Sequence, residues 1–228
     1  GAFVQITSGG GEFQNVIYGH SCALDEDGDS DLDLAVGAMG YNILDGGVFV
    51  YNLNSLEADA GNPTSYSGDP SSREMFGWAL SRDVGGSSGD SLLIGAPFAG
   101  VNNSGRVISI KANGQSSERN NPLVNINNAH LGYRVVAGSD ITGDGLPDNV
   151  ASTPDTNTGT VVIWNTPGAT GTILQGSQAN EKFGYSLDIS LDTNFDGADD
   201  LIVGAPHTDN LKGRFGVYDA TTLAFDSI

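Results

Sequence analysis

The chain of 228 residues repeats one pattern four times, and this repetition limits the folds that it can adopt. Each repeat opens with an aromatic or apolar residue followed by glycine. It continues through an apolar segment that ends in a Gly-Ala-Pro-like sequence, and then through an alternating segment led by glycine. The opening segments are YGHSCALD from Tyr18, FGWALSRD from Phe76, LGYRVVAG from Leu131 and FGYSLDIS from Phe183. Because these features recur in the same order about every 55 residues, we expect one structural unit per repeat.

The later segments of each repeat have the character of β-strands. The second segments are LAVGAM, LLIGAP, NVASTP and LIVGAP, and the third are GVFVYN, GRVISI, GTVVIW and GRFGVY. No helical periodicity of adequate length interrupts them, and a polar stretch long enough for a fourth strand follows. Four strands per repeat predict an all-β fold, namely a β-propeller of four-stranded blades, with a solenoid of parallel strands as the alternative.

The repeats predict a single β-propeller domain over residues 1–228. It has an N-terminal half repeat (1–17), where GAFVQI resembles a third segment, and full repeats at about 18–74, 75–129, 130–181 and 182–228. The half repeat could complete the sheet of the last blade, or the chain could be part of a larger ring.

The composition excludes several classes of protein. Lys and Arg number 9 against 28 Asp and Glu, and the net charge of −19 disfavours binding to nucleic acid or to an anionic membrane surface. No apolar run approaches the ~20 residues needed to span a bilayer. The single cysteine, Cys22, excludes an internal disulfide framework, and its apolar surroundings predict a buried thiol.

Acidic loops separate the first and second segments in three repeats, at residues 25–33, 140–148 and 192–200. Oxygen-bearing side chains fall at loop positions 1, 3, 5 and 9, with glycine at position 4 or 6. Alternating oxygen ligands and a backbone carbonyl at position 7 suit Ca²⁺ better than Mg²⁺. Ordinary Asp-Gly turns are the alternative, but these carboxylates recur at one place in the repeat and would repel one another without a cation. The predicted ligands of three calcium ions are Asp25, Asp27, Asp29, Asp31, Asp33, Asp140, Thr142, Asp144, Leu146, Asp148, Asp192, Asn194, Asp196, Ala198 and Asp200.

The second repeat lacks this set of ligands. Alignment on the Gly-Ala-Pro segments places Asp83 at position 1, and Gly85, Ser87 and Ser91 at positions 3, 5 and 9. One carboxylate and two hydroxyls cannot replace three or four charged ligands around a divalent ion. We therefore predict no ion in the second repeat, and the tightest binding in the loop at 25–33, where positions 1, 3, 5 and 9 are all Asp.

The order of these motifs resembles the FG-GAP repeat of integrin α-subunit β-propellers and related extracellular proteins. The fourth repeat carries all three parts, in Phe183-Gly184, in the loop at 192–200 and in LIVGAP at 201–206, and the resemblance covers about residues 18–228. It implies an extracellular or cell-surface location, and calcium loops on the face opposite most ligand contacts. Family members usually carry seven such repeats. The departures from the pattern are Tyr18, Met39, Leu131 and residues 151–154.

No catalytic motif is present, and we expect no enzymatic activity. The three histidines, His20, His130 and His207, stand in different repeats, and HExxH, GxSxG and phosphate-binding glycine loops are missing from the sequence. Paired carboxylates for glycoside hydrolysis need not be close in the chain, but the clustered acids are accounted for as metal ligands.

These features predict a calcium-binding extracellular scaffold for cell adhesion or protein–protein recognition. Its partner would be an extracellular protein or glycan. The turns after the second segments differ between repeats, so Tyr41, Phe98 and His207 are the candidate contacts. One alternative is a carbohydrate-binding lectin that uses Trp78 or Trp164. Another is a structural subunit of a cell-surface filament, which would assemble into a larger surface structure.

Overall fold

A computed structural model of the chain describes residues 17–25, 33–52, 63–83, 91–111, 114–165, 169–190, 192–193, 195–219 and 224–227. These residues form four antiparallel sheets of four strands each, so the predicted all-β class is confirmed. Two single turns, α1 (Tyr41–Leu44) and α3 (Thr208–Leu211), are the helical elements in the described part of the chain, and both contain left-handed residues.

Each sheet is built from one repeat, with its strands in chain order. Sheet one contains β1 (Tyr18–Asp25), β2 (Asp33–Ala38), β3 (Gly47–Asn52) and β4 (Thr64–Ser67). Sheet two contains β5 (Ala79–Asp83), β6 (Ser91–Ala96), β7 (Arg106–Lys111) and β8 (Ser116–Glu118). Sheet three contains β9 (Arg134–Ser139), β10 (Asp148–Thr153), β11 (Thr160–Trp164) and β12 (Thr172–Gln175). Sheet four contains β13 (Ser186–Ser190), β14 (Asp200–Ala205), β15 (Arg214–Asp219) and β16 (Ala224–Ser227).

The apolar second segments form strands that are buried on both faces. Every residue of β10 is buried, whereas the outer strands β8 and β12 are mostly exposed. A strand covered on both faces has a continuous apolar sequence rather than an alternating one, which explains LLIGA and LIVGA.

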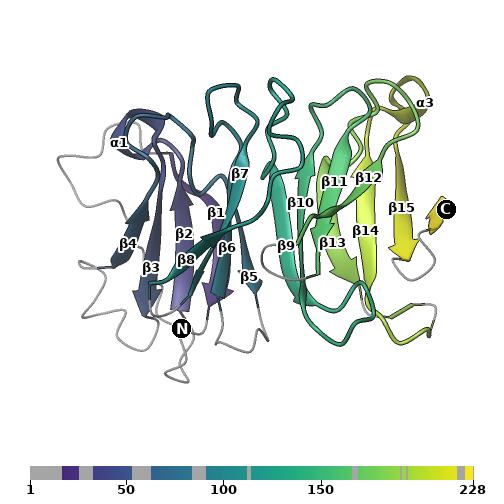
Figure 1. Ribbon diagram of the computed structural model, residues 1–228, viewed down its shortest axis with the longest axis horizontal. Coiled ribbons are helices and arrows are strands. Elements are labelled where there is room, and N and C mark those ends of the chain that lie inside the picture. Colours follow the sequence, from purple (N-terminus) through teal and green to yellow (C-terminus); the bar gives the residue numbers. More distant parts are fainter. Residues whose placement is uncertain are drawn as a thin grey trace, which may run out of the picture.

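The four sheets lie side by side, and α1 and α3 lie along the same edge of the molecule (Figure 1). Contacts between the first strands connect β1 to β5, β5 to β9 and β9 to β13. Three apolar clusters fill the spaces between the sheets. Val48 packs with Phe76 between sheets one and two, Val107 with Leu131 between two and three, and Val161 with Phe183 between three and four.

The glycines of the two motifs meet where neighbouring sheets join. A Cβ atom on Gly95 would lie 2.1 Å from the carbonyl oxygen of Gly132, and one on Gly132 would lie 2.7 Å from that of Arg106. Gly132 also has a φ of 96°, which side chains rarely adopt. A parallel bridge between Gly105 and Leu131 joins the same two sheets, and Gly46–Phe76 and Gly159–Phe183 repeat it. The Phe-Gly and Gly-Ala-Pro motifs therefore recur together because each is half of one joint.

The fourth sheet takes all four of its strands from its own repeat. Residues 1–16 of the N-terminal half repeat lie outside the described part, so the role predicted for that segment stays a prediction. The predicted burial of Cys22 is wrong, because this thiol is exposed. Its strand, β1, pairs only with β2 among the described strands, so its apolar stretch is not enclosed as β10 is.

Candidate functional site

The acidic loop of the third repeat connects β9 to β10. The carboxylate of Asp140 accepts hydrogen bonds from the backbone amides of Asp144 (3.0 Å) and Gly145 (2.7 Å). Asp144 in turn accepts one from the amide of Leu146 (2.9 Å). Gly145 has a φ of 82°, which lets the chain turn back over Asp140. The loop therefore wraps around its own carboxylates.

Asp148 closes this loop at the start of β10 and is fully buried. One of its oxygens accepts hydrogen bonds from the amides of Ile141 and Thr142, both at 2.7 Å. The other accepts one from the Thr142 hydroxyl (3.3 Å). Burial raises the pKa of Asp148 to about 6, although the hydrogen bonds from Thr142 and Ile141 act in the opposite direction.

The loop of the fourth repeat has the same bonds at corresponding residues. Asp192 accepts from the amides of Asp196 (3.1 Å) and Gly197 (2.9 Å), and Asp196 accepts from that of Ala198 (2.9 Å). Asp200 is buried at the start of β14 and accepts from the amide of Thr193 at 2.8 Å. Two loops with different intervening residues have thus folded into one geometry.

The donor set of these loops fits a hard cation such as calcium. Each of the two loops carries three Asp carboxylates at predicted ligand positions, and a carboxylate has about four lone-pair sites, so an amide bond leaves room for a cation. The carbonyl position is held by Leu146 in one loop and by buried Ala198 in the other. In the described part of the chain, however, no three His, Cys, Asp or Glu side chains converge closely enough to count as a metal cluster.

Some of the predicted ligands lie outside the described residues, namely Asp27, Asp29, Asp31 and Asn194. In the first repeat, Asp25 ends β1 and Asp33 begins β2, and the two face each other in the register of the sheet. Asp33 is buried, like Asp148 and Asp200 at the corresponding strand starts. The three repeats thus share a buried aspartate at position 9.

The second repeat, for which no ion is predicted, uses the carboxylate at loop position 1 differently. Asp83 ends β5 and lies 3.9 Å from a guanidinium nitrogen of Arg119, which is itself buried. Nε of Arg119 donates to the side-chain oxygen of Asn149 in sheet three (2.7 Å). A protein cation therefore faces the carboxylate that corresponds to Asp140.

A row of aromatic rings lies at the opposite ends of the first strands. The residue after each Phe-Gly-like pair belongs to it, so the row runs across all four sheets. The ring centroids are 4.7 Å apart for His20 and Trp78, 5.7 Å for Trp78 and Tyr133, and 5.7 Å for Tyr133 and Tyr185. Tyr133 and Tyr185 precede β9 and β13, whereas the acidic loops follow those strands. The sequence signal for this row was an aromatic residue or histidine after the glycine of every repeat, and sequence reasoning missed it.

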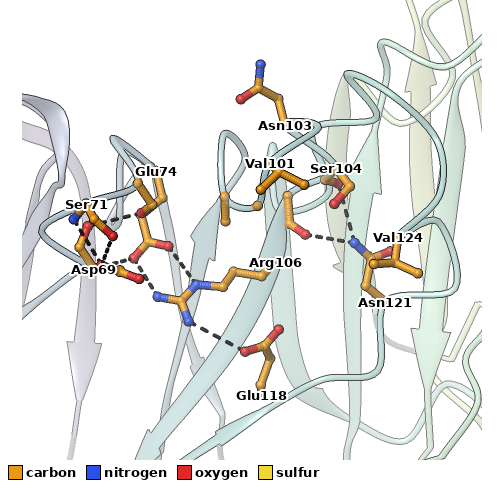
Figure 2. A pocket seen from close by; sticks show the side chains of 14 residues that line it. Asp69, Ser71, Glu74, Val101, Asn103, Ser104, Arg106, Glu118, Asn121 and Val124 are labelled. Carbon is orange, nitrogen blue, oxygen red and sulfur yellow. Dashed lines mark hydrogen bonds and ion pairs between the residues drawn. The ribbon is translucent and has the colours of Figure 1, made fainter.

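An ion pair with a buried glutamate and a half-buried arginine was also missed. Glu74 and Arg106 line a cleft of about 620 Å³ to which the segment between β4 and β5 also contributes. Figure 2 shows the two side chains facing each other. Nε of Arg106 donates to Glu74 at 2.8 Å, and the amide of Asp69 donates to the same carboxylate at 2.8 Å. The groups satisfy one another, so this cleft holds a structural clamp. Glu181 and Arg214 form the same pair beside sheet four (3.0 Å), whereas Ala129 and Thr160 stand at the corresponding places beside sheet three.

Comparison with known proteins adds to this geometry. No protein-family model matches the chain. Integrin alpha-PS2 of Drosophila melanogaster is 38% identical over 96 residues, which is 39% of this chain and 7% of that protein. Integrin alpha-8 of Mus musculus is 42% identical over 83 residues (34% and 7%), and integrin alpha ina-1 of Caenorhabditis elegans is 48% identical over 46 residues (19% and 4%).

The chain is similar to integrin α subunits. The match with the fly and mouse proteins covers 7% of their length, so the activity of the whole integrin subunit is not carried over with it. No helix among the residues that the structure describes is both long and apolar enough to cross a membrane.

The candidate contacts of this integrin-like chain stand in turns of three different sheets. Phe98 joins the aromatic row, with ring centroids 5.8 Å from Trp78 and 4.6 Å from His130. Tyr41 is half-buried and packs edge-on against Phe49 (5.3 Å). His207 is exposed before α3. Of the three residues, Phe98 therefore has the position that suits a contact in an extended surface.

The two tryptophans have different surroundings. Trp164 is buried in the cluster between sheets two and three, and its Nε1 donates to the carbonyl of Asn120 (2.9 Å). It is therefore a core residue and cannot stack on a sugar. Trp78 remains half-buried within the aromatic row.

Proposed function

We propose that this chain forms calcium-stabilised β-propeller blades that act as an extracellular scaffold for cell adhesion or protein–protein recognition. The partial similarity to integrin α subunits supports the adhesion-related role. Four sheets of four antiparallel strands, joined in series through one repeated joint, support the propeller architecture.

The calcium part of the proposal is carried by the loops at 140–148 and 192–200. Asp140, Asp144 and Asp148 would hold one ion with the Leu146 carbonyl, and Asp192, Asp196 and Asp200 would hold another with that of Ala198. A bound calcium ion would neutralise the three predicted ligand carboxylates that each of these loops carries. A third ion would bind at 25–33.

The location follows from this ligand chemistry. The three loops offer short Asp side chains and no Glu at position 12, so they should be filled reliably where calcium is near millimolar. That concentration is typical of the extracellular space, in agreement with the proposed scaffold.

The recognition part of the proposal is carried by the aromatic row. Aromatic side chains that stand partly exposed in a contiguous row are typical of protein-binding surfaces, since they contribute large contact areas at low entropic cost. The row lies at the strand ends opposite the calcium loops, so metal binding can stabilise the frame without blocking the contact surface.

A cell-adhesion assay tests this proposal. Cells adhere in millimolar calcium to a surface coated with the 228-residue chain, and adhesion is compared among Trp78→Ala, Phe98→Ala and Phe195→Ala. Phe195 is the matched control, because it is an aromatic residue with 91% exposure at the calcium-loop end. We expect the two row variants to reduce adhesion at least about tenfold and Phe195→Ala to leave it unchanged. Equal adhesion of all three variants and the parent chain would refute the assignment of the row.

A further inference from the structure

Strand β12 forms the outer edge of sheet three, and its far side is open in the described part of the chain. It pairs with β11 alone, from Thr172 opposite Ile163 to Gln175 opposite Thr160. Because the backbone groups of successive residues in a strand point to alternate sides, every second residue of β12 presents its N–H and C=O groups outward. An added strand in extended conformation can pair with these groups along the whole edge.

The side chains of β12 lack the charges that usually keep such an edge from pairing. No Asp, Glu, Lys, Arg or His occurs at residues 156–180, a range that contains both β11 and β12. Ile173 is 42% exposed, and it lies opposite the core residue Val162 in the register of the sheet. The other outer strands differ, since Glu118 ends β8, the sequence of β16 contains Asp226, and β4 exposes Thr and Ser side chains.

A cleft beside β12 has room for side chains of an added strand. Its volume is about 400 Å³, and all four residues of β12 line it, together with Phe183, Arg214 and Tyr218 of the fourth repeat. Leu174 lies on this side of the strand, where it packs against the apolar cluster that contains Phe183. Arg214 is paired with buried Glu181, so the guanidinium charge in the cleft is neutralised.

From these features we propose that β12 pairs with β12 of a second copy of this chain, so that two four-stranded sheets join edge to edge. A twofold axis near Ile173 places the same residues of both copies in an antiparallel pair, in which each open edge satisfies the other. The charge distribution selects this partner. Each copy carries a net charge of −19, so two copies approach each other at the lowest electrostatic cost through an uncharged edge, and both copies offer the same one.

This contact goes beyond the proposed function, because it uses neither the calcium loops nor the aromatic row. An interface built on four residues from each copy is much smaller than the roughly 1,200 to 2,000 Å² of a stable complex. Pairing is therefore weak, with a Kd on the order of 0.1 mM. It links copies where they are concentrated, as on a densely covered surface, and leaves dilute copies apart.

Sedimentation equilibrium of the intact 228-residue chain measures this association, over concentrations from about 10 μM to about 1 mM. The parent chain is compared with Ile173→Lys, which places like charges opposite each other across the twofold axis. Ser65→Lys is the matched control, because Ser65 lies opposite Phe49 in β4 as Ile173 lies opposite Val162 in β12. Both variants change the net charge of the chain equally.

We expect a monomer–dimer equilibrium in the parent chain, an association at least about fivefold weaker in Ile173→Lys, and no change in Ser65→Lys. Hydrogen exchange of the parent chain should show amides in 172–175 gaining protection as the concentration rises, and those in 64–67 gaining none. A parent chain that stays monomeric at about 1 mM would overturn the proposal and leave this edge to an extended segment of another protein. Dimers that both variants weaken equally, or that neither weakens, would overturn the assignment to β12.

Discussion

Sheets two and three share one backbone plan but differ in the polar groups at both ends. Sheet two has the Glu74–Arg106 clamp at one end and the Asp83–Arg119 pair at the other. Sheet three has Ala129 at the place of the clamp glutamate, and three carboxylates in its acidic loop.

The apolar joint is nevertheless the same on both sides of sheet three. The bridge from Gly105 to Leu131 and the bridge from Gly159 to Phe183 are both parallel, and both join the glycine before a third strand to the first residue of the next repeat's opening motif. The difference between the two sheets teaches that the joint defines the fold, whereas ion pairs and acidic loops are separate elements that one repeat can have and the next can lack.

Removal of calcium should produce the largest loss of stability. It should act on sheets one, three and four, whose loops carry the predicted calcium ligands, and not on sheet two. At a hundredfold excess of calcium over Kd, each site stabilises the folded chain by about 2.7 kcal/mol. Three sites then amount to about 8 kcal/mol, and a chelator should lower the Tm by roughly 15 to 30 °C. Differential scanning calorimetry with and without a chelator measures this shift.

The double variant Asp144→Asn/Asp196→Asn serves as the control for that measurement. It should show about a third of the chelator effect, contributed by the loop at 25–33. A double variant that retains the whole shift would locate the metal elsewhere.

Loss of half of the clamp should produce the second largest effect, in sheet two. Arg106→Thr introduces the residue found at the same place in sheet three and leaves Glu74 buried without its cation. We expect a loss of about 3 to 5 kcal/mol, measured by urea unfolding. The variant Glu74→Ala/Arg106→Thr copies both residues of sheet three and should recover much of that loss. A double variant that is no more stable than Arg106→Thr would show that the two sheets are not interchangeable at this point.

Asp83 and Asp140 occupy the same loop position and should respond differently to calcium. Asp83→Asn leaves Arg119 buried without a carboxylate, so we expect a loss of about 1 to 3 kcal/mol both with and without calcium. Asp140→Asn should destabilise the chain more in calcium than in chelator. Urea unfolding of both variants in both buffers tests this contrast, and a calcium-dependent loss in Asp83→Asn would contradict it.

The turns of sheets two and three should differ slightly in their response to pH. Sheet three has Asp155 where sheet two has Phe98. Burial raises the pKa of Asp155, but hydrogen bonds from Lys182 and His130 outweigh burial, and the pKa is lowered overall. A carboxylate with a lowered folded-state pKa stabilises the protein above its unfolded-state pKa, and this contribution disappears as the pH falls through the folded-state value.

Asp155→Asn removes that contribution. The Tm difference between the parent chain and this variant should be a few degrees near pH 6 and should shrink toward about pH 3. A difference that grows as the pH falls would contradict the assigned direction.

The strands were predicted well from the sequence because each of the four repeats can be aligned with the other three. The apolar second segments and the glycines of both motifs define one unit in four copies, and the structure shows a four-stranded sheet for each. The burial of Cys22 was predicted wrongly, because an apolar segment indicates burial only where other elements cover it. Among the described strands, β1 pairs with β2 alone.

The two site features that were missed depend on contacts between distant residues. Glu74 and Arg106 are 32 residues apart, and their sequence signal is a paired change, since Ala129 and Thr160 stand at both corresponding places beside sheet three. Nothing in the sequence points to Arg119 as the partner of Asp83, because that contact depends on how the end of β8 packs against sheet three. The position of the acidic loops between the first and second strands was predictable, because oxygen-bearing residues at fixed spacing give a clear signal. The calcium chemistry of these loops stays a prediction.

A crystal structure of the chain grown in calcium tests the central claim most directly. The account predicts calcium ions in the loops at 25–33, 140–148 and 192–200, with oxygen ligands at about 2.4 Å, and no ion in the loop at 83–91. Water-like density in any of the first three loops, or a seven-coordinate ion beside Asp83, would contradict it.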